Sequence, residues 1–160
     1  ILFADGAGAV VISSDTSTGI KHSKLYSDGS FMSSLHVNNN GINELGTIEM
    51  SGSEVFKIAV TKLSDLAEET LQDCNMTSDD ITWMVPHQAN IRIIKAVAKR
   101  INLPMSKVIQ TLDTHGNTSA ASIPLALDTG VRDGRIKKGD MLLFEGIGGG
   151  FSWGSVLVEF

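Results

Sequence analysis

Trp83–Ile94, with the sequence WMVPHQANIRII, joins a predicted strand to a predicted helix. The apolar residues before Pro86 indicate the end of a buried strand, and Pro86 cannot continue the ladder because it lacks an N–H group. From Asn90 onward, apolar residues recur at helical spacing, which predicts an amphipathic helix. His87 therefore stands at the carboxyl end of a strand, where open α/β sheets place their working residues.

A second polar loop, with the sequence HGNTSAAS at residues 115–122, follows about one βα unit later and contains Asn117. A neutral histidine and an asparagine amide can both donate hydrogen bonds to one oxygen. Two such donors stabilise a developing enolate or oxyanion, commonly by ~3 kcal/mol each, which suits decarboxylation or carbon–carbon bond formation on a thioester. The alternative is a buried His87 satisfied by a backbone group, with Asn117 as a helix cap.

The remaining pattern alternates between strands and helices, which predicts an α/β fold. Strands are expected at residues 20–26, 47–50, 141–144 and 151–160, and an amphipathic helix at residues 52–74. Val108 to Leu112 is either another short strand or a connector. The glycine run at residues 146–150 has two open interpretations, a bend needed for packing or backbone N–H groups exposed toward a reacting oxygen.

The composition narrows the class of protein. A chain of 160 residues that is 42% hydrophobic and 19% charged is globular, and its net charge of −5 argues against a nucleic-acid-binding protein. No apolar run reaches the ~20 residues that span a bilayer. The one cysteine, Cys74, excludes an internal disulfide and fits a reducing, cytoplasmic compartment. No Cys/His cluster has zinc spacing, so no metal is expected.

The two ends of the chain resemble each other. DGAGAVVI at residues 5–12 and GGFSWGSVLV at residues 149–158 are both Gly-rich bends that lead into an apolar strand. This similarity predicts a fold of two similar halves. Residues 1–14 would be the last strand region of a truncated N-terminal half, residues 15–51 a variable connection, and residues 52–160 the C-terminal half. The chain begins in mid-strand without an initiator Met, so we expect it to be a fragment.

Five segments resemble β-ketoacyl-acyl-carrier-protein synthase III, a family of condensing enzymes. They are Asp5 to Val11, Gly52 to Val60, Val85 to Ile94, Gly116 to Asp133 and Gly148 to Phe160. The resemblance is specific, because elongating ketosynthases have a second histidine where Asn117 stands. It implies the C-terminal half of a thiolase-like fold, with a mixed five-stranded sheet and helices on both faces.

The resemblance implies an acyltransferase that condenses acyl-CoA with malonyl-carrier protein to initiate fatty-acid biosynthesis. Acetyl-CoA is the expected primer. His87 and Asn117 match the last two members of a Cys–His–Asn triad and would promote decarboxylation. The nucleophilic cysteine lies in the first half, so these residues alone are expected to be inactive. Cys74 does not match it, and its acidic neighbours indicate an inert thiol. Coenzyme A thioesters and carrier-protein phosphopantetheine are substrates, and no cofactor is implied.

Further positions follow from the same resemblance. Gly149 matches the residue whose N–H helps to hold the acyl oxyanion. The pantetheine channel is matched by Gly52, Phe56, Ala89, Asn90 and Ile93. The face that receives the acidic acyl carrier protein is matched by Lys57, Arg92, Lys99 and Arg100, although a basic stripe is also typical of a solvated helix face.

The implied partners are the acyl carrier protein, acyl-CoA, the N-terminal half of the same protein and a second copy in a homodimer, with no nucleic acid and no membrane. Two other functions remain open. One is a related synthase of secondary metabolism, and the other is a non-catalytic thiolase-like module that binds a carrier protein.

Overall fold

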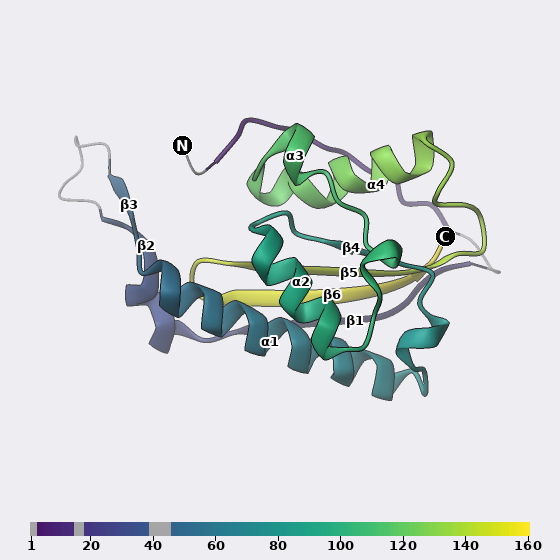
Figure 1. Ribbon diagram of the computed structural model, residues 1–160, viewed down its shortest axis with the longest axis horizontal. Helices are drawn as coiled ribbons and strands as arrows, with labels where there is room; N and C mark the ends of the chain where they lie inside the picture. The colour runs from purple at the N-terminus through teal and green to yellow at the C-terminus, as the bar shows by residue number, and fades with distance from the viewer. Residues whose placement is uncertain (1–2, 15–17, 39–45) are drawn as a thin grey trace.

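The computed structural model describes residues 3–14, 18–38 and 46–160, and a sheet between two helical layers forms its centre (Figure 1). Helices α1 (Gly52–Asp73) and α2 (Ile91–Arg100) cover one face of the sheet. Helix α4 (Ser122–Arg132) covers part of the other face. A short helix, α3 (Leu112–His115), lies in the connection between α2 and α4. In the described part of the chain, no helix is long and apolar enough to cross a membrane.

The main sheet is mixed. Strands β1 (Gly19–Ser27), β4 (Trp83–Pro86), β5 (Met141–Gly148) and β6 (Ser152–Glu159) lie in the order β1-β6-β5-β4. β4 and β5 are parallel, whereas β6 is antiparallel to both of its neighbours. A separate hairpin of β2 (Leu35–Asn38) and β3 (Thr47–Met50) projects beyond the start of α1 (Figure 1).

The α/β class with helices on both faces is confirmed, but the expected number of five strands needs correction. The described residues form a four-stranded main sheet. At the expected fifth position, Val108 makes a single parallel bridge to Met84. The ladder stops there because the next donor on β4 would be Pro86, which has no N–H group.

The side chain of Gln88 takes the place of the missing ladder. Its amide nitrogen donates to the carbonyl oxygens of Pro86 at 2.9 Å and Ile109 at 3.1 Å. Its amide oxygen accepts the backbone N–H of Thr111 at 3.1 Å. Gln88 is fully buried, so this inserted amide fixes the loop after β4 against the segment that leads to Asn117.

Apolar side chains form a cluster on each face of the sheet. Ile94 and Val97 of α2 pack with Leu143 of β5 on one face, and Ala126 of α4 packs with Leu142 on the other. The helical spacing predicted α1 and α2 to within a residue or two at each end. Asn90 caps α2, because its side chain accepts the N–H of Arg92 at 2.8 Å.

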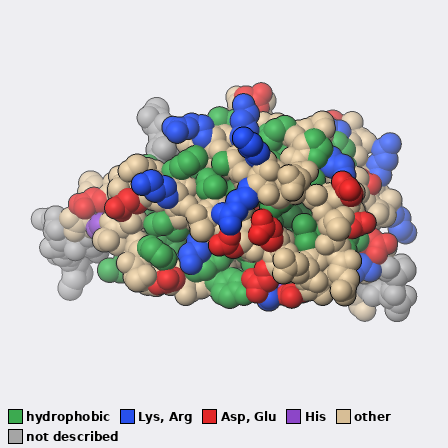
Figure 2. Space-filling view, turned by 60° about the horizontal axis from the view of Figure 1, so that its bottom comes forward, with side chains coloured by type: hydrophobic (Ala, Val, Ile, Leu, Met, Phe, Trp, Pro, Cys, Tyr) green, Lys and Arg blue, Asp and Glu red, His purple; other side chains and the backbone are tan. Residues whose placement is uncertain are grey.

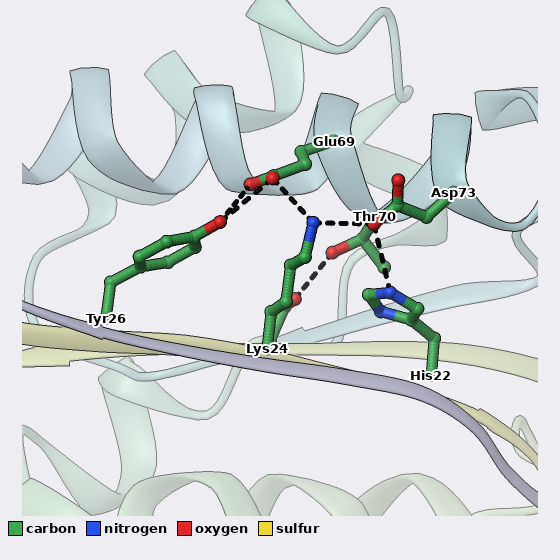
Figure 3. Close-up of polar contacts among 7 residues, drawn as sticks. His22, Lys24, Tyr26, Glu69, Thr70 and Asp73 are labelled. Atoms are coloured by element: carbon green, nitrogen blue, oxygen red, sulfur yellow. Dashed lines mark hydrogen bonds and ion pairs between the residues drawn. The ribbon is translucent and has the colours of Figure 1, made fainter.

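Strand β1 lies at the edge of the sheet and is tied to α1 by polar side chains (Figure 3). The ammonium group of Lys24 contacts the carboxylates of Glu69 at 2.5 Å and Asp73 at 2.6 Å. Tyr26 donates to Glu69 at 2.8 Å. The hydrogen bond from Lys24 lowers the pKa of the Glu69 carboxyl below its usual value, so the pair stays charged at neutral pH.

Residues 3–14 pass along α4 without a strand partner in the described ranges, although the sequence predicted an apolar strand after the Gly-rich bend of this segment. Gly6 and Gly8 allow this close passage. A Cβ atom on Gly8 would lie 2.5 Å from Pro124, and one on Gly6 would lie 2.8 Å from Thr118. The segment continues past α4 as an extended chain with exposed apolar side chains, Val11 being 97% exposed.

Candidate active site

His87 is held at the end of β4 by contacts from three sides. Its backbone N–H donates to the carbonyl of Glu145 on β5 at 2.7 Å, which carries the β4–β5 ladder one step past Pro86. Its ring Nδ1 lies 2.7 Å from Oγ of Ser122 at the start of α4. Gln88, the residue that follows His87, is fixed by its own side-chain hydrogen bonds. The imidazole is therefore positioned by the sheet, the loop and the helix together.

The environment of His87 favours a neutral ring. Burial lowers its pKa below the usual value for histidine, and a hydrogen bond with the backbone of Ser119 opposes this shift with a smaller effect. A neutral imidazole has one N–H donor and one bare nitrogen. At neutral pH, His87 can therefore donate a hydrogen bond without carrying a positive charge.

Asn117 is buried in the loop before α4, and its amide orientation is fixed. Its side-chain oxygen accepts the backbone N–H of Ser119 at 2.9 Å, and its backbone carbonyl accepts the N–H of Ala4 at 2.8 Å. Only the oxygen of an amide can accept from an N–H group, so both N–H donors of Asn117 remain for a ligand. Ser119 has φ = 53°, the left-handed conformation that turns the chain here.

His87, Asn117 and Gly149 line one cavity of about 260 Å³. The five residues expected to bind pantetheine, Gly52, Phe56, Ala89, Asn90 and Ile93, line the same cavity. Further lining side chains come from Leu35, Met50, Val55, Ala59, Ser119, Ile147 and Phe151. With Phe3, residues from six separate parts of the chain thus converge on one small, largely apolar cavity with a few polar groups, which is typical of a ligand site.

Gly149 lies in the turn between β5 and β6. A Cβ atom there would lie 3.2 Å from the carbonyl oxygen of Leu35, so the close approach of this segment favours glycine. The turn therefore supports the packing interpretation of the glycine run. It also places Gly149 in the wall of the cavity. A role of the Gly149 N–H in holding an oxyanion stays a prediction.

The predicted carrier-protein face lies on α1 and α2, beside the cavity. The guanidinium group of Arg92 stacks over the ring of Phe56, 5.2 Å from its centroid, so a basic side chain covers one lining residue. Lys57 and Lys99 are exposed, whereas Arg100 forms an ion pair with Asp65. Figure 2 shows Lys and Arg side chains spread over this side of the molecule among hydrophobic and acidic ones, and a carrier-protein role for these four residues stays a prediction.

A buried carboxyl group lies on β5, next to the residues that hold His87. Glu145 is 1% exposed, and neither carboxyl oxygen has a hydrogen-bond partner in the described structure. Burial raises the pKa of this carboxyl well above its usual value, so the folded protein retains a proton that the unfolded chain releases above about pH 4.5. Stability should consequently fall as the pH rises through this range.

Glu145→Gln should remove this pH-dependent loss, because the amide has a similar shape and no proton to lose. We expect the variant to have a higher Tm, with a larger gain at about pH 8 than at about pH 5. Each kcal/mol added to the free energy of unfolding should raise the Tm by roughly 2–4 °C. Thermal unfolding of the whole polypeptide measures this, with Glu68→Gln on the partly exposed side of α1 as the control. A gain independent of pH would contradict the assignment of a buried neutral carboxyl.

Sequence reasoning missed several residues that build the site. No role at the site was assigned from the sequence to the hairpin residues Leu35 and Met50, and Phe151 was interpreted only as the start of a strand. Ser122 was placed only at the end of the second polar loop, without a role. The amide of Gln88 beside Pro86 was a usable signal, since a buried side chain must replace the N–H that proline lacks.

The family described as "3-Oxoacyl-[acyl-carrier-protein (ACP)] synthase III C terminal" matches residues 71–160. The β-ketoacyl-[acyl-carrier-protein] synthase III of Vesicomyosocius okutanii is 71% identical over 160 residues, which are 100% of this chain and 51% of that protein. The protein of the same name from Methylococcus capsulatus is 52% identical over 100% of this chain and 51% of its own length. The chain thus spans about half the length of the curated relatives it matches.

Solved structures agree with these sequence matches. The crystal structure of 3-oxoacyl-[acyl-carrier-protein] synthase III from Aquifex aeolicus matches with a TM-score of 0.87 and 38% identity, over 92% of this chain and 46% of that chain. The corresponding protein from Pseudomonas aeruginosa matches with a TM-score of 0.85 and 35% identity, over 92% and 47%. The expected thiolase-like fold is confirmed by these neighbours.

Proposed function

Because this chain belongs to the 3-oxoacyl-[acyl-carrier-protein] synthase III C-terminal family, we propose that it forms the C-terminal half of an acyltransferase that condenses acyl-CoA with malonyl-carrier protein. Acetyl-CoA is the expected primer, and the product starts fatty-acid biosynthesis. The observation that carries this proposal is the convergence of His87, Asn117 and Gly149 on one cavity.

The two donors act on the malonyl thioester. The neutral imidazole of His87 and the amide of Asn117 donate hydrogen bonds to its carbonyl oxygen. As CO₂ leaves, the electron pair of the broken carbon–carbon bond forms an enolate, and the charge on its oxygen is stabilised by both donors. The enolate carbon then attacks the carbonyl carbon of the acyl-enzyme thioester, and the cysteine leaves as a thiolate. Gly149 N–H would help to hold the oxyanion formed in that attack.

The nucleophile would come from outside these residues. Cys74 is the C-cap residue of α1 and is absent from the residues that line the cavity. The relatives are about twice as long, which leaves room for a first half that carries the cysteine. Two apolar side chains are available to pack against that half, since Val11 is 97% and Leu25 84% exposed.

Residues 1–160 alone should form no acyl-enzyme with radiolabelled acetyl-CoA, because the cavity contains no thiol among its described lining residues. Adding the N-terminal half of the Vesicomyosocius relative should restore labelling and condensation. The label should then lie on the cysteine of that half. Mass spectrometry of the labelled peptide identifies the site. Stoichiometric labelling of Cys74 would refute the proposal, and Cys74→Ser provides the matched control.

The carrier protein would approach over Arg92, with Lys57, Lys99 and Arg100 beside it, while Gly52, Phe56, Ala89, Asn90 and Ile93 line the pantetheine channel. Support comes from the position of Arg92 over Phe56, which joins the basic face to the cavity. Electrostatic attraction of this kind supplies mainly a faster, salt-sensitive association.

Arg92→Glu should weaken binding of the acyl carrier protein by about tenfold at low salt, and high salt should reduce the difference from wild type. Titration calorimetry at two salt concentrations measures the effect. The control is Lys138→Glu, which makes the same change of charge in the turn before β5, at the end of that strand remote from the cavity. Equal effects of the two substitutions would argue against docking at α2.

We further propose that the whole protein is a cytoplasmic homodimer. Residues 1–160 contain one cysteine, Cys74, which fits a reducing compartment, and the exposed apolar side chains give a surface for assembly. Light scattering on the whole polypeptide tests the assembly, and a monomer at micromolar concentration would contradict it.

A further inference from the structure

Ser122, the first residue of α4, contacts both His87 and the backbone that follows it. Its Oγ lies 2.7 Å from Nδ1 of His87 and accepts the backbone N–H of Gln88 at 3.1 Å. The residue is 1% exposed and is not among those that line the cavity. Ser122 thus reaches His87 from behind, on the side away from a substrate.

Counting hydrogens assigns the proton on the imidazole. A serine hydroxyl has one hydrogen to donate, and the N–H of Gln88 already uses Oγ as an acceptor. If Nδ1 carried the ring proton, Oγ would face two donors, and the hydroxyl hydrogen would have no acceptor among the described residues. If Nδ1 is bare, the hydroxyl donates to it and every group is satisfied, as buried polar groups require.

We propose that Ser122 is a positioning residue that holds His87 in the tautomer with its proton on Nε2. This inference rests on the proposed function in one respect: Nε2–H is then the donor that meets the thioester oxygen beside Asn117. Besides the weaker hydrogen bond of the ring with the backbone of Ser119, the hydroxyl of Ser122 is the described group that selects this tautomer. A ring with its proton on Nδ1 would present a lone pair to the enolate oxygen and repel it.

Neighbouring features keep this contact in place. Gln88 holds the chain after His87 through its three side-chain hydrogen bonds. Ser122 begins α4, whose Ala126 is fully buried against the sheet. The hydroxyl therefore bridges two fixed elements, and a serine is short enough to fit between them. The small residues from Ser119 to Ser122 serve this bridge as well as close packing.

The ring protonation can be measured directly. In the whole polypeptide with ¹⁵N-labelled histidine, long-range ¹H–¹⁵N spectra should show His87 with a bare Nδ1 and a protonated Nε2. Absence of the signals in His87→Gln assigns them. In Ser122→Ala the two tautomers should mix, and malonyl decarboxylation should fall by about tenfold, as expected when a buried acceptor loses its partner.

Ser64→Ala is the matched control, because Ser64 is a fully buried serine of α1 whose Oγ has no partner in the described structure. It should change neither the tautomer nor the turnover. A proton on Nδ1 in the unsubstituted protein would overturn the proposal without any variant having to fold. A Ser122→Ala protein that keeps both tautomer and turnover would also overturn it. The expected tautomer in a protein that condenses nothing would refute the proposed function and still support the role of Ser122.

Discussion

His87→Ala should lower the rate of malonyl decarboxylation by about two orders of magnitude, and Asn117→Ala should have an effect of similar size. Each substitution removes one of the two donors proposed to stabilise the enolate oxygen. Because both donors act on the same oxygen, the double variant should lose less than the product of the two single effects.

Release of labelled CO₂ from malonyl-carrier protein by the whole polypeptide measures this step. Acylation by acetyl-CoA, followed separately, should be much less affected, since it does not require the enolate. His36→Ala is the matched control, because this histidine lies in the β2–β3 hairpin and is not among the cavity residues. Decarboxylation at the wild-type rate in either single variant would remove that residue from the proposed mechanism.

Gln88→Ala should destabilise the folded protein by about 3 kcal/mol or more, which is the largest effect on stability that we expect from a single polar side chain here. The substitution would leave the carbonyls of Pro86 and Ile109 and the N–H of Thr111 without their buried partner. Gln88→Glu should also be destabilising, because a carboxylate cannot donate to the two carbonyls.

Urea unfolding of the whole polypeptide measures this loss, and the decarboxylation assay should report a displaced His87 in the same variants. The control is Gln110→Ala, an exposed glutamine in the segment that Gln88 binds. If both glutamine variants were equally stable, the inserted amide would contribute nothing to the fold.

The sequence predicted those elements whose pattern is local. The spacing of apolar residues identified α1 and α2 because one face of each helix packs on the sheet. It did not predict the end of the sheet at Val108, since that depends on how the amide of Gln88 replaces the donor that Pro86 lacks. Strand β5 continues four residues further than expected, through Gly148, because the glycines pair with β6.

The sequence predicted only some residues of the site, because the others depend on contacts between distant parts of the chain. The residues expected around His87 and Asn117 came from the resemblance to a family, and they do line one cavity. Ser122 could not be identified from spacing, because its contact with His87 joins positions far apart in the chain and exists only after α4 packs on the sheet. The buried carboxyl of Glu145 was equally hidden, since one acidic residue after an apolar run resembles the start of a loop.

The amide proton of Thr111 has an unusual acceptor, the side chain of Gln88 instead of a neighbouring strand. Its exchange with solvent deuterium therefore depends on whether that side chain is in place, and Gln88 directly follows His87. One backbone proton outside the cavity lining consequently reports on the alignment of the site, and it does so in the resting protein without substrate or turnover.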